Sequence, residues 1–135
     1  MCIRDSEYLA SLPATRELST SDGTLLLCHG LGADDMAGVR PDDFGYALRS
    51  NDTLHSLVAA GRFRYVVAGH THHRMVRHFD GLTIVNAGTL YRDHDPCFGL
   101  VDLSERVVTF YRASGTVRPD IIQQIGLEVV TGTSS

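Results

Sequence analysis

The sequence predicts a strand-rich α/β fold in which pairs of strands pack face to face and helices are few. Three stretches of apolar residues, each divided by a short turn, carry this prediction. They are "TRELSTSDGTLLLC" (15–28), "RMVRHFDGLTIVN" (74–86) and "CFGLVDLSERVVTFYR" (97–112). The chain has 135 residues, of which 43% are hydrophobic and 21% charged, and this composition fits one globular domain.

The first half of the chain begins with a predicted helix over residues 7–13, which ends at Pro13. Residues 15–28 are expected to form two strands around a Ser-Asp-Gly turn, the second strand running over 24–28. The connection that follows, residues 30–50, is far longer than the usual ~4–6 residues, which indicates a functional or partly helical segment.

The second half opens with a short helix over residues 51–61. Asn51 or Asp52 is its expected N-cap and Gly61 its C-cap, with three apolar side chains facing inward (Leu54, Leu57 and Val58). The strand "RYVVAG" (64–69) comes next. Two hairpins follow, one around Asp80-Gly81, which favours a type I′ turn, and one around Ser104-Glu105.

The two ends of the chain are expected to lie outside the fold. "MCIRDS" resembles a translated adapter or assembly scar, so residues 1–6 are interpreted as a non-native leader, although an ordinary frayed terminus is the alternative. Residues 119–135 have little pattern and are expected to be a loose tail. The domain would then span residues 7–118.

The overall composition excludes several classes of protein. The formal net charge of −4 argues against a nucleic-acid binder, and no apolar run reaches the ~20 residues of a membrane helix. The three cysteines (Cys2, Cys28 and Cys97) are odd in number and lack the C-x-x-C spacing of metal sites. A reduced chain in the cytoplasm is the expectation.

A histidine cluster raises the question of function. Four of the seven histidines lie in "VVAGHTHHRMVRHFDG" (66–81). Residues i and i+2 of an extended segment face the same way, so His70 and His72 are expected to point to one place. Imidazole is the commonest metal ligand at neutral pH. On its own, the H-x-H pattern fits two solvated loop histidines equally well.

A histidine at a second strand end favours a binding site over two solvated loop histidines. "LLLCHG" (25–30) places His29 at the end of another apolar strand, again followed by glycine. Ligand sites in α/β sheets lie at the carboxyl ends of the strands. We therefore expect the rings of His29, His70 and His72 to converge on one site. Cys28 neighbours His29 on the strand and is expected to point to the opposite face.

These residues carry a resemblance to a known family. His29-Gly30 after a strand, the run Gly69-His70-Thr71-His72 and the later "IVNAGTL" (84–90) resemble the C-terminal half of the calcineurin-like metallophosphoesterases, and in particular small bacterial phosphodiesterases. The resemblance covers roughly residues 7–112. It implies the C-terminal part of a four-layer α/β/β/α sandwich of two mixed sheets, and thus a partial domain over residues 7–118.

The resemblance also implies a metal centre. Family members use two divalent metal ions bridged by an aspartate. By resemblance, His29 and His70 would bind the second ion and His72 the first. The segment Asn86-Ala87-Gly88 corresponds to the family's Asn-Pro-Gly turn, with alanine in place of proline, and is given a structural role.

Four nearby polar residues match no ligand position of the family. His73 and His78 are expected to be exposed or to lie beside the ligands. Asp34 and Asp35, in the loop after His29, are expected to be solvated.

The departures from the family pattern are as informative. The D-x-H, G-D and G-N-H motifs of the family's first half are absent. Two metal ions ~3.5–4 Å apart need carboxylate charge between them, which three neutral imidazoles do not supply. We therefore expect this chain to be the C-terminal half of an enzyme, with little or no turnover alone. Without the other half, an apolar sheet face would be exposed, which favours self-association.

Three functions are compatible with these observations. The first is a metal-dependent phosphodiesterase or phosphatase in its full-length form, acting on a small phosphate-ester substrate with Mn, Fe, Zn or a similar ion. The second is a non-catalytic scaffold of the same fold, and the third is a simple histidine metal-binding module. A scaffold has no need of the three histidines, and a simple module does not explain the place of His29. The enzyme ranks first, whereas the substrate, the metal and the oligomeric state stay open.

Overall fold

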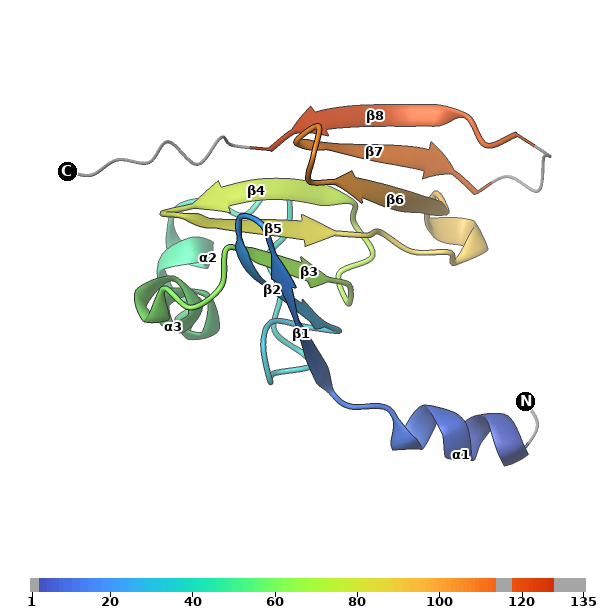
Figure 1. The fold of residues 1–135 in the computed structure, drawn as a ribbon, viewed down its shortest axis with the longest axis horizontal. Coiled ribbons are helices and arrows are strands. Elements are labelled where there is room, and N and C mark those ends of the chain that lie inside the picture. Colours follow the sequence, from blue (N-terminus) through green and yellow to red (C-terminus); the bar gives the residue numbers. More distant parts are fainter. Residues whose placement is uncertain (1–2, 114–117, 128–135) are drawn as a thin grey trace.

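The computed structural model describes residues 3–113 and 118–127, which form two β-sheets and a few short helices (Figure 1). The larger sheet has five strands in the order β1-β2-β3-β5-β4. These strands are β1 (Thr15–Thr20), β2 (Gly23–Cys28), β3 (Tyr65–Ala68), β5 (Leu82–Asn86) and β4 (Met75–Phe79). The central strands β2, β3 and β5 run parallel, and β1 and β4 pair antiparallel at the two edges. The sheet is therefore mixed, as predicted.

The smaller sheet contains three antiparallel strands, β6 (Cys97–Asp102), β7 (Val107–Arg112) and β8 (Ile121–Gly126). The prediction of a loose tail over residues 119–135 is wrong for residues 121–127, because β8 pairs with β7 and Leu127 is buried. The adjacent glutamines Gln123 and Gln124 interrupt the alternation of apolar and polar residues in β8. The pairing of β7 with β8 also has a register shift between Phe110 and Tyr111. Residues 128–135 of the predicted tail lie outside the described part.

Helices occupy little of the described chain. They are α1 (Ile3–Ser11), α2 (Tyr46–Arg49), α3 (Asp52–Ala60) and the 3₁₀ turn η1 (Arg92–His94). Residues 3–6 form the first turn of α1, and the interpretation of residues 1–6 as a non-native leader stays a prediction. Figure 1 shows α1 projecting away from the sheets beyond β1, and its residues 7–11 are all exposed. The helix predicted over 7–13 thus exists, but it starts earlier and ends at Ser11.

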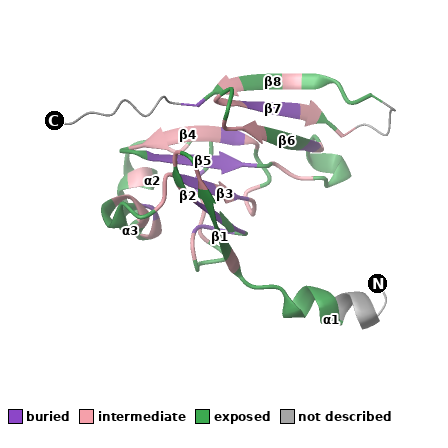
Figure 2. Ribbon diagram, viewed as in Figure 1, coloured by how far each residue is buried: buried purple, intermediate pink, exposed green. Residues whose placement is uncertain are grey.

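The larger sheet is buried on both faces, because successive residues of its central strands enter different cores. Leu26, Val66 and Ile84 pack with residues of α3 and of the loop after His29. Their neighbours Leu25, Tyr65 and Val85 pack against Val108 and Phe110 of the smaller sheet. Figure 2 shows β5 buried along its length between these two layers. The described residues therefore form successive helix, sheet and sheet layers, which confirms the predicted face-to-face packing of sheets.

The hairpins and α3 follow the local sequence closely. Asp80 and Gly81 both adopt positive φ angles, 45° and 88°, as a type I′ turn requires. Asn51 caps α3 by accepting a hydrogen bond from the Leu54 amide at 3.0 Å, and Gly61 ends the helix in the left-handed conformation with φ 60°. Leu54 is buried, and Leu57 and Val58 pack against the same core. These predictions are confirmed.

Asn51 supports the long loop as well as the helix, because its side-chain amide donates to the carbonyl oxygen of Gly38 at 3.1 Å. We expect Asn51→Ala to lower the free energy of unfolding by about 1 kcal/mol, since it removes the cap. Urea denaturation measures this change. Ser56→Ala, at an exposed position of the same helix, is the control and should stay within about 0.5 kcal/mol of the parent. Equal losses in the two variants would contradict the role of the cap.

A buried polar contact joins the two sheets. The Tyr65 hydroxyl donates to Asp22 Oδ2 at 2.9 Å, and Arg106, from the β6–β7 turn, donates to Asp22 Oδ1 at 3.0 Å. Tyr65 is 1% exposed. Burial raises the pKa of the Tyr65 hydroxyl, and the hydrogen bond to Asp22 raises it further. The phenol therefore stays protonated as a donor that ties the β1–β2 turn to β3, while Arg106 links the same turn to the smaller sheet.

None of the helices in the described ranges is long and apolar enough to cross a membrane.

Candidate metal centre

Three strand ends meet at one edge of the larger sheet. Because β2, β3 and β5 run parallel, their carboxyl ends lie side by side there. Hydrogen bonds continue the pairing just beyond the strands, from the Gly69 amide to the His29 carbonyl at 2.8 Å and from the Ala87 amide to the Ala68 carbonyl at 3.1 Å. The three motifs that carry the family resemblance are thereby brought to one place.

His29 and His70 form a close pair at this edge. Their ring centroids are 5.4 Å apart and the rings lie edge to face, at 71°. With a metal–nitrogen bond of about 2.1 Å, two imidazoles on a single ion have centroids up to about 6 Å apart. His29 is exposed and His70 is half-buried. The centroid distance of the pair falls within this range, and the assignment of both rings to one ion stays a prediction.

His72 lies in a different pair. The premise that His70 and His72 share an extended segment is wrong, because both adopt the left-handed conformation, with φ 68° and 65°. Positive φ is uncommon for residues other than glycine, and such strain gathers at functional sites. His72 Nδ1 instead lies 3.0 Å from His94 Nδ1, in a hydrogen bond between the two rings. His94, at the end of η1, also meets the Tyr91 ring edge to face at 4.7 Å.

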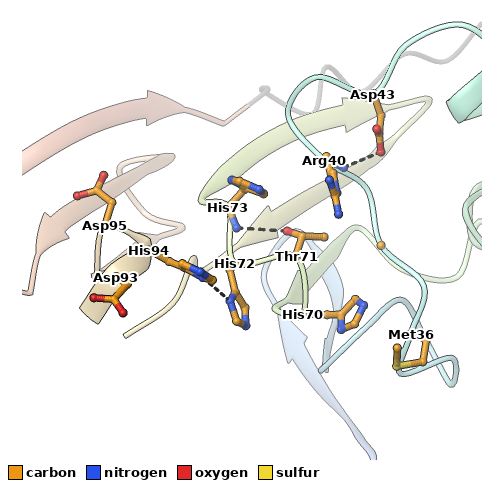
Figure 3. Close-up of a pocket in the computed structure, with 11 residues that line it drawn as sticks. Met36, Arg40, Asp43, His70, Thr71, His72, His73, Asp93, His94 and Asp95 are labelled. Atoms are coloured by element: carbon orange, nitrogen blue, oxygen red, sulfur yellow. Dashed lines mark hydrogen bonds between the residues drawn. The ribbon is translucent and has the colours of Figure 1, made fainter. Parts of the chain in front are cut away.

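Sequence reasoning missed His94. It stands alone in "YRDHDP", far along the chain from the other histidines, and no spacing rule links it to His72. Only the fold, which places η1 beside the loop after β3, brings the two rings together (Figure 3).

Asn86 holds the histidine loop in shape. Its side chain is 2% exposed, and its amide donates to the Gly69 carbonyl at 2.7 Å and to Thr71 Oγ1 at 3.0 Å. Its Oδ1 accepts from the Gly88 amide at 2.9 Å, and Gly88 takes a left-handed φ of 77°. The structural role predicted for this asparagine thus has a geometry: one side chain ties the ends of β3 and β5 together.

A pocket of about 890 Å³ opens beside His70 and His72 (Figure 3). One side is formed by the histidine loop, from His70 to His73, and the facing side by the long loop between β2 and α3. A third side is formed by Asp93 and His94 of the turn η1 and by Asp95, which follows it. The long loop is therefore partly helical, through α2, and also lines a site, as its length predicted.

The remaining polar residues do not join the histidine pair. Asp34 and Asp35 are exposed, and Asp34 Oδ1 accepts from the Met36 amide at 3.0 Å. His73 is exposed. His78 lies on β4, and its Nδ1 is hydrogen-bonded to Oγ1 of Thr83 on β5 at 2.8 Å.

Cys28 packs into the core on the helix side of the sheet. Burial raises the pKa of its thiol above the ordinary value, and this outweighs a hydrogen bond from the Gly32 backbone that lowers it.

The donor set therefore fits part of a two-metal centre. Imidazole nitrogens are present, as an ion such as zinc or manganese prefers. Within residues 3–113 and 118–127, however, no group of three or more His, Cys, Asp or Glu side chains is placed to hold a metal ion. The bridging carboxylate of such a centre would have to come from another segment of protein.

Comparison with solved structures reveals the same fold. Vacuolar Protein Sorting 29 from Cryptosporidium parvum aligns with a TM-score of 0.54 and 21% identity, over 85% of this chain. Vps29 from Entamoeba histolytica, solved in complex with Zn²⁺, aligns with a TM-score of 0.53 and 19% identity, over 83% of this chain. A hypothetical protein from Pyrococcus horikoshii OT3 gives 0.52 and 13%, over 93%. The alignments cover 58%, 61% and 44% of those proteins, so this chain spans only part of their length.

The search of curated proteins finds no match. The family model described as "Calcineurin-like phosphoesterase superfamily domain" matches residues 3–106, which is most of the chain and includes the His29, Gly69–His72 and Asn86 motifs. The mixed sheet with a second sheet packed on it agrees with that assignment. This chain belongs to the calcineurin-like phosphoesterase superfamily.

Proposed function

We propose that this chain supplies the histidine side of a two-metal site in a metal-dependent phosphoesterase, a phosphodiesterase or phosphatase that hydrolyses small phosphate esters. The observation that carries the proposal is the His29–His70 pair, held 5.4 Å apart at adjacent strand ends beside an open pocket. Membership of the superfamily supports the reaction class. Free, buried Cys28 and Cys97 suit a reducing compartment, so we also propose the cytoplasm as its location.

Each residue has a defined part in this proposal. His29 and His70 would hold one divalent ion and His72 the other, as the family resemblance implies. Bound ions of this kind activate a water molecule and offset the charge on phosphoryl oxygens. His94 holds the His72 ring through a hydrogen bond to His72 Nδ1, so His72 Nε2 would be the atom available to bind an ion. Asn86 fixes the loop between the two histidines of the G-H-x-H motif.

Manganese titration of the full chain tests the metal site. Mn²⁺ broadens the NMR signals of nearby amides, so we expect selective loss of the signals of residues 29–30 and 69–72 at low stoichiometry. His70→Ala should abolish this selectivity. His55→Ala, at an exposed histidine of α3, is the matched control and should leave it unchanged. Broadening that is unaffected by His70→Ala would overturn the proposed site.

Two further measurements distinguish a chain that supplies only part of a two-metal site from a self-sufficient metal-binding module or enzyme. Two neutral ligands leave an ion largely hydrated, so excess zinc or manganese should barely raise the melting temperature. With a generic aryl phosphodiester and manganese, the chain should turn over no faster than its His72→Ala variant. A large thermal stabilisation lost on His70→Ala would favour a metal-binding module, and a robust rate lost on His29→Ala would show a complete enzyme.

A further inference from the structure

We propose that Arg40 is a specificity-determining residue of this site, which binds two oxygens of the phosphate group and selects monoesters over diesters. The inference rests on the proposed function for its reaction, and it names the substrate class of the same pocket. It is carried by two observations: the guanidinium of Arg40 lies on the pocket wall without a carboxylate partner among residues 3–113 and 118–127, and a second arginine fixes its backbone.

Arg40 stands across the pocket from the histidine loop. Both line the same cavity of about 890 Å³, and Figure 3 shows the Arg40 side chain extending from the long loop toward Thr71. The residue is exposed, so its guanidinium is open to a ligand. Of the carboxylates in the described part of the chain, none pairs with it; the contact to Asp43 is made by the Arg40 backbone amide, at 2.8 Å.

The carboxylates of the pocket lining lie mostly on the side formed by η1, whereas the guanidinium of Arg40 lies on the long-loop side together with Asp43. Asp95 is paired with Arg74 at 2.9 Å, and Asp43 Oδ2 is engaged by the Arg40 amide. Asp93, on η1, is the remaining carboxylate of the lining, on the side formed by η1. A bound anion is therefore drawn toward Arg40 and away from η1, since like charge repels it there.

Arg77 positions this loop. From β4, its Nη1 donates to the Arg40 carbonyl at 2.9 Å and to the Asp43 carbonyl at 2.8 Å. Its guanidinium also lies over the rings of Phe44 and Phe79, at 4.8 and 5.0 Å from their centroids. A loop held at two carbonyls and stacked on an aromatic ring keeps its shape before the ligand arrives, which lowers the entropy lost on binding.

The geometry of the guanidinium selects the ligand. It presents paired N–H donors that fit two phosphate oxygens at once. A monoester has three non-bridging oxygens and a diester has two. A monoester can therefore engage Arg40 with two oxygens and still direct a third toward the histidine side of the pocket. A diester would leave the histidine side with an ester oxygen only.

Phenyl phosphate titrated into the chelator-treated full chain tests the proposal. The NMR signals of the arginine Nε–H groups and of the pocket amides report binding in the absence of metal. We expect Arg40→Gln to weaken binding about fivefold to tenfold, as the loss of a charge-assisted contact in an open site implies. Arg49→Gln, which removes the same charge from an exposed position on α2 outside the pocket, should leave binding unchanged. Methyl phenyl phosphate should bind more weakly than phenyl phosphate, and Arg40→Gln should remove that preference.

Arg77→Lys separates positioning from general charge. Lysine keeps the charge but cannot hold both carbonyls and stack as arginine does. At a temperature where the variant remains folded, we expect about threefold weaker binding of phenyl phosphate and loss of the ligand-induced shift of the Arg40 Nε–H signal. An unchanged affinity would overturn the positioning role.

The outcomes distinguish this inference from the proposed function. Equal affinity in the Arg40→Gln and Arg49→Gln variants overturns the role of Arg40, whatever the manganese titration shows. Binding that survives Arg40→Gln and disappears in His70→Ala places the anion on the histidines, which also overturns it. If manganese broadening is unaffected by His70→Ala while phosphate binding still depends on Arg40, the metal site fails and the arginine site stands.

Discussion

Gly30→Ala is expected to lower the free energy of unfolding by about 3 kcal/mol, the upper end of what overpacking usually costs. A methyl group at this position would collide with the backbone carbonyl of Asp34 and lie 2.6 Å from the carbonyl oxygen of Asp35. These are backbone atoms, so no side-chain rotation relieves the clash. Gly30 directly follows His29, and the turn over residues 31–34 must shift to admit the methyl group, which would displace the candidate ligand as well.

Urea denaturation measures the loss, and Gly126→Ala is the matched control. A methyl group at Gly126 meets no atom within 4 Å, and Gly126 is not among the glycines with positive φ. Its replacement should change stability by about 0.5 kcal/mol at most. If the two glycine variants lose the same stability, close backbone approach at Gly30 is not what the fold requires.

Asn86→Ala is expected to destabilise the chain by about 3 kcal/mol, since it removes three hydrogen bonds of a buried residue that contribute about 1 kcal/mol each. The loop that carries His70 and His72 loses its anchor at the same time. The manganese-dependent broadening at residues 69–72 should therefore weaken in this variant, even at temperatures where it remains folded.

Asn86→Asp refines this test because it keeps the shape of the side chain. Its carboxylate can still accept from the Gly88 amide, but its second oxygen would face the Gly69 carbonyl and Thr71 Oγ1 without a proton to donate. We expect a loss at neutral pH close to that of alanine. An Asn86→Asp variant as stable as the parent would show that the two donated bonds contribute little.

The local elements of the fold could be predicted because their determinants are adjacent in the sequence. Asp80-Gly81 satisfies a type I′ turn by its own conformational preference, and Asn51 caps α3 three residues from its partner amide. The strand β8 could not be predicted, because Gln123 and Gln124 interrupt the pattern and the strand is recognised only by its pairing with β7. The conformation of residues 121–126 is therefore set by pairing with a neighbouring strand and not by their local sequence pattern.

Some residues of the candidate site could likewise be predicted from the sequence, and others could not. The positions of His29 and His70 follow from two strand–glycine motifs, and parallel pairing makes them neighbours. The direction of His72 does not follow, because its positive φ turns the ring away from the alternation of an extended chain. His94 and Arg40 carry no motif at all and enter the site only through the fold.

The topology of the larger sheet has a consequence for the order of folding. The pairs β1–β2, β4–β5, β6–β7 and β7–β8 join strands that are consecutive in the chain, whereas Leu25 of β2 pairs with Tyr65 of β3 across the long loop and α3. Closing such a distant pair costs more chain entropy than closing a hairpin, so it is expected to form later and to limit the folding rate. The His29–His70 contact is created by this same pairing, so the two imidazoles meet only when the rate-limiting step is complete.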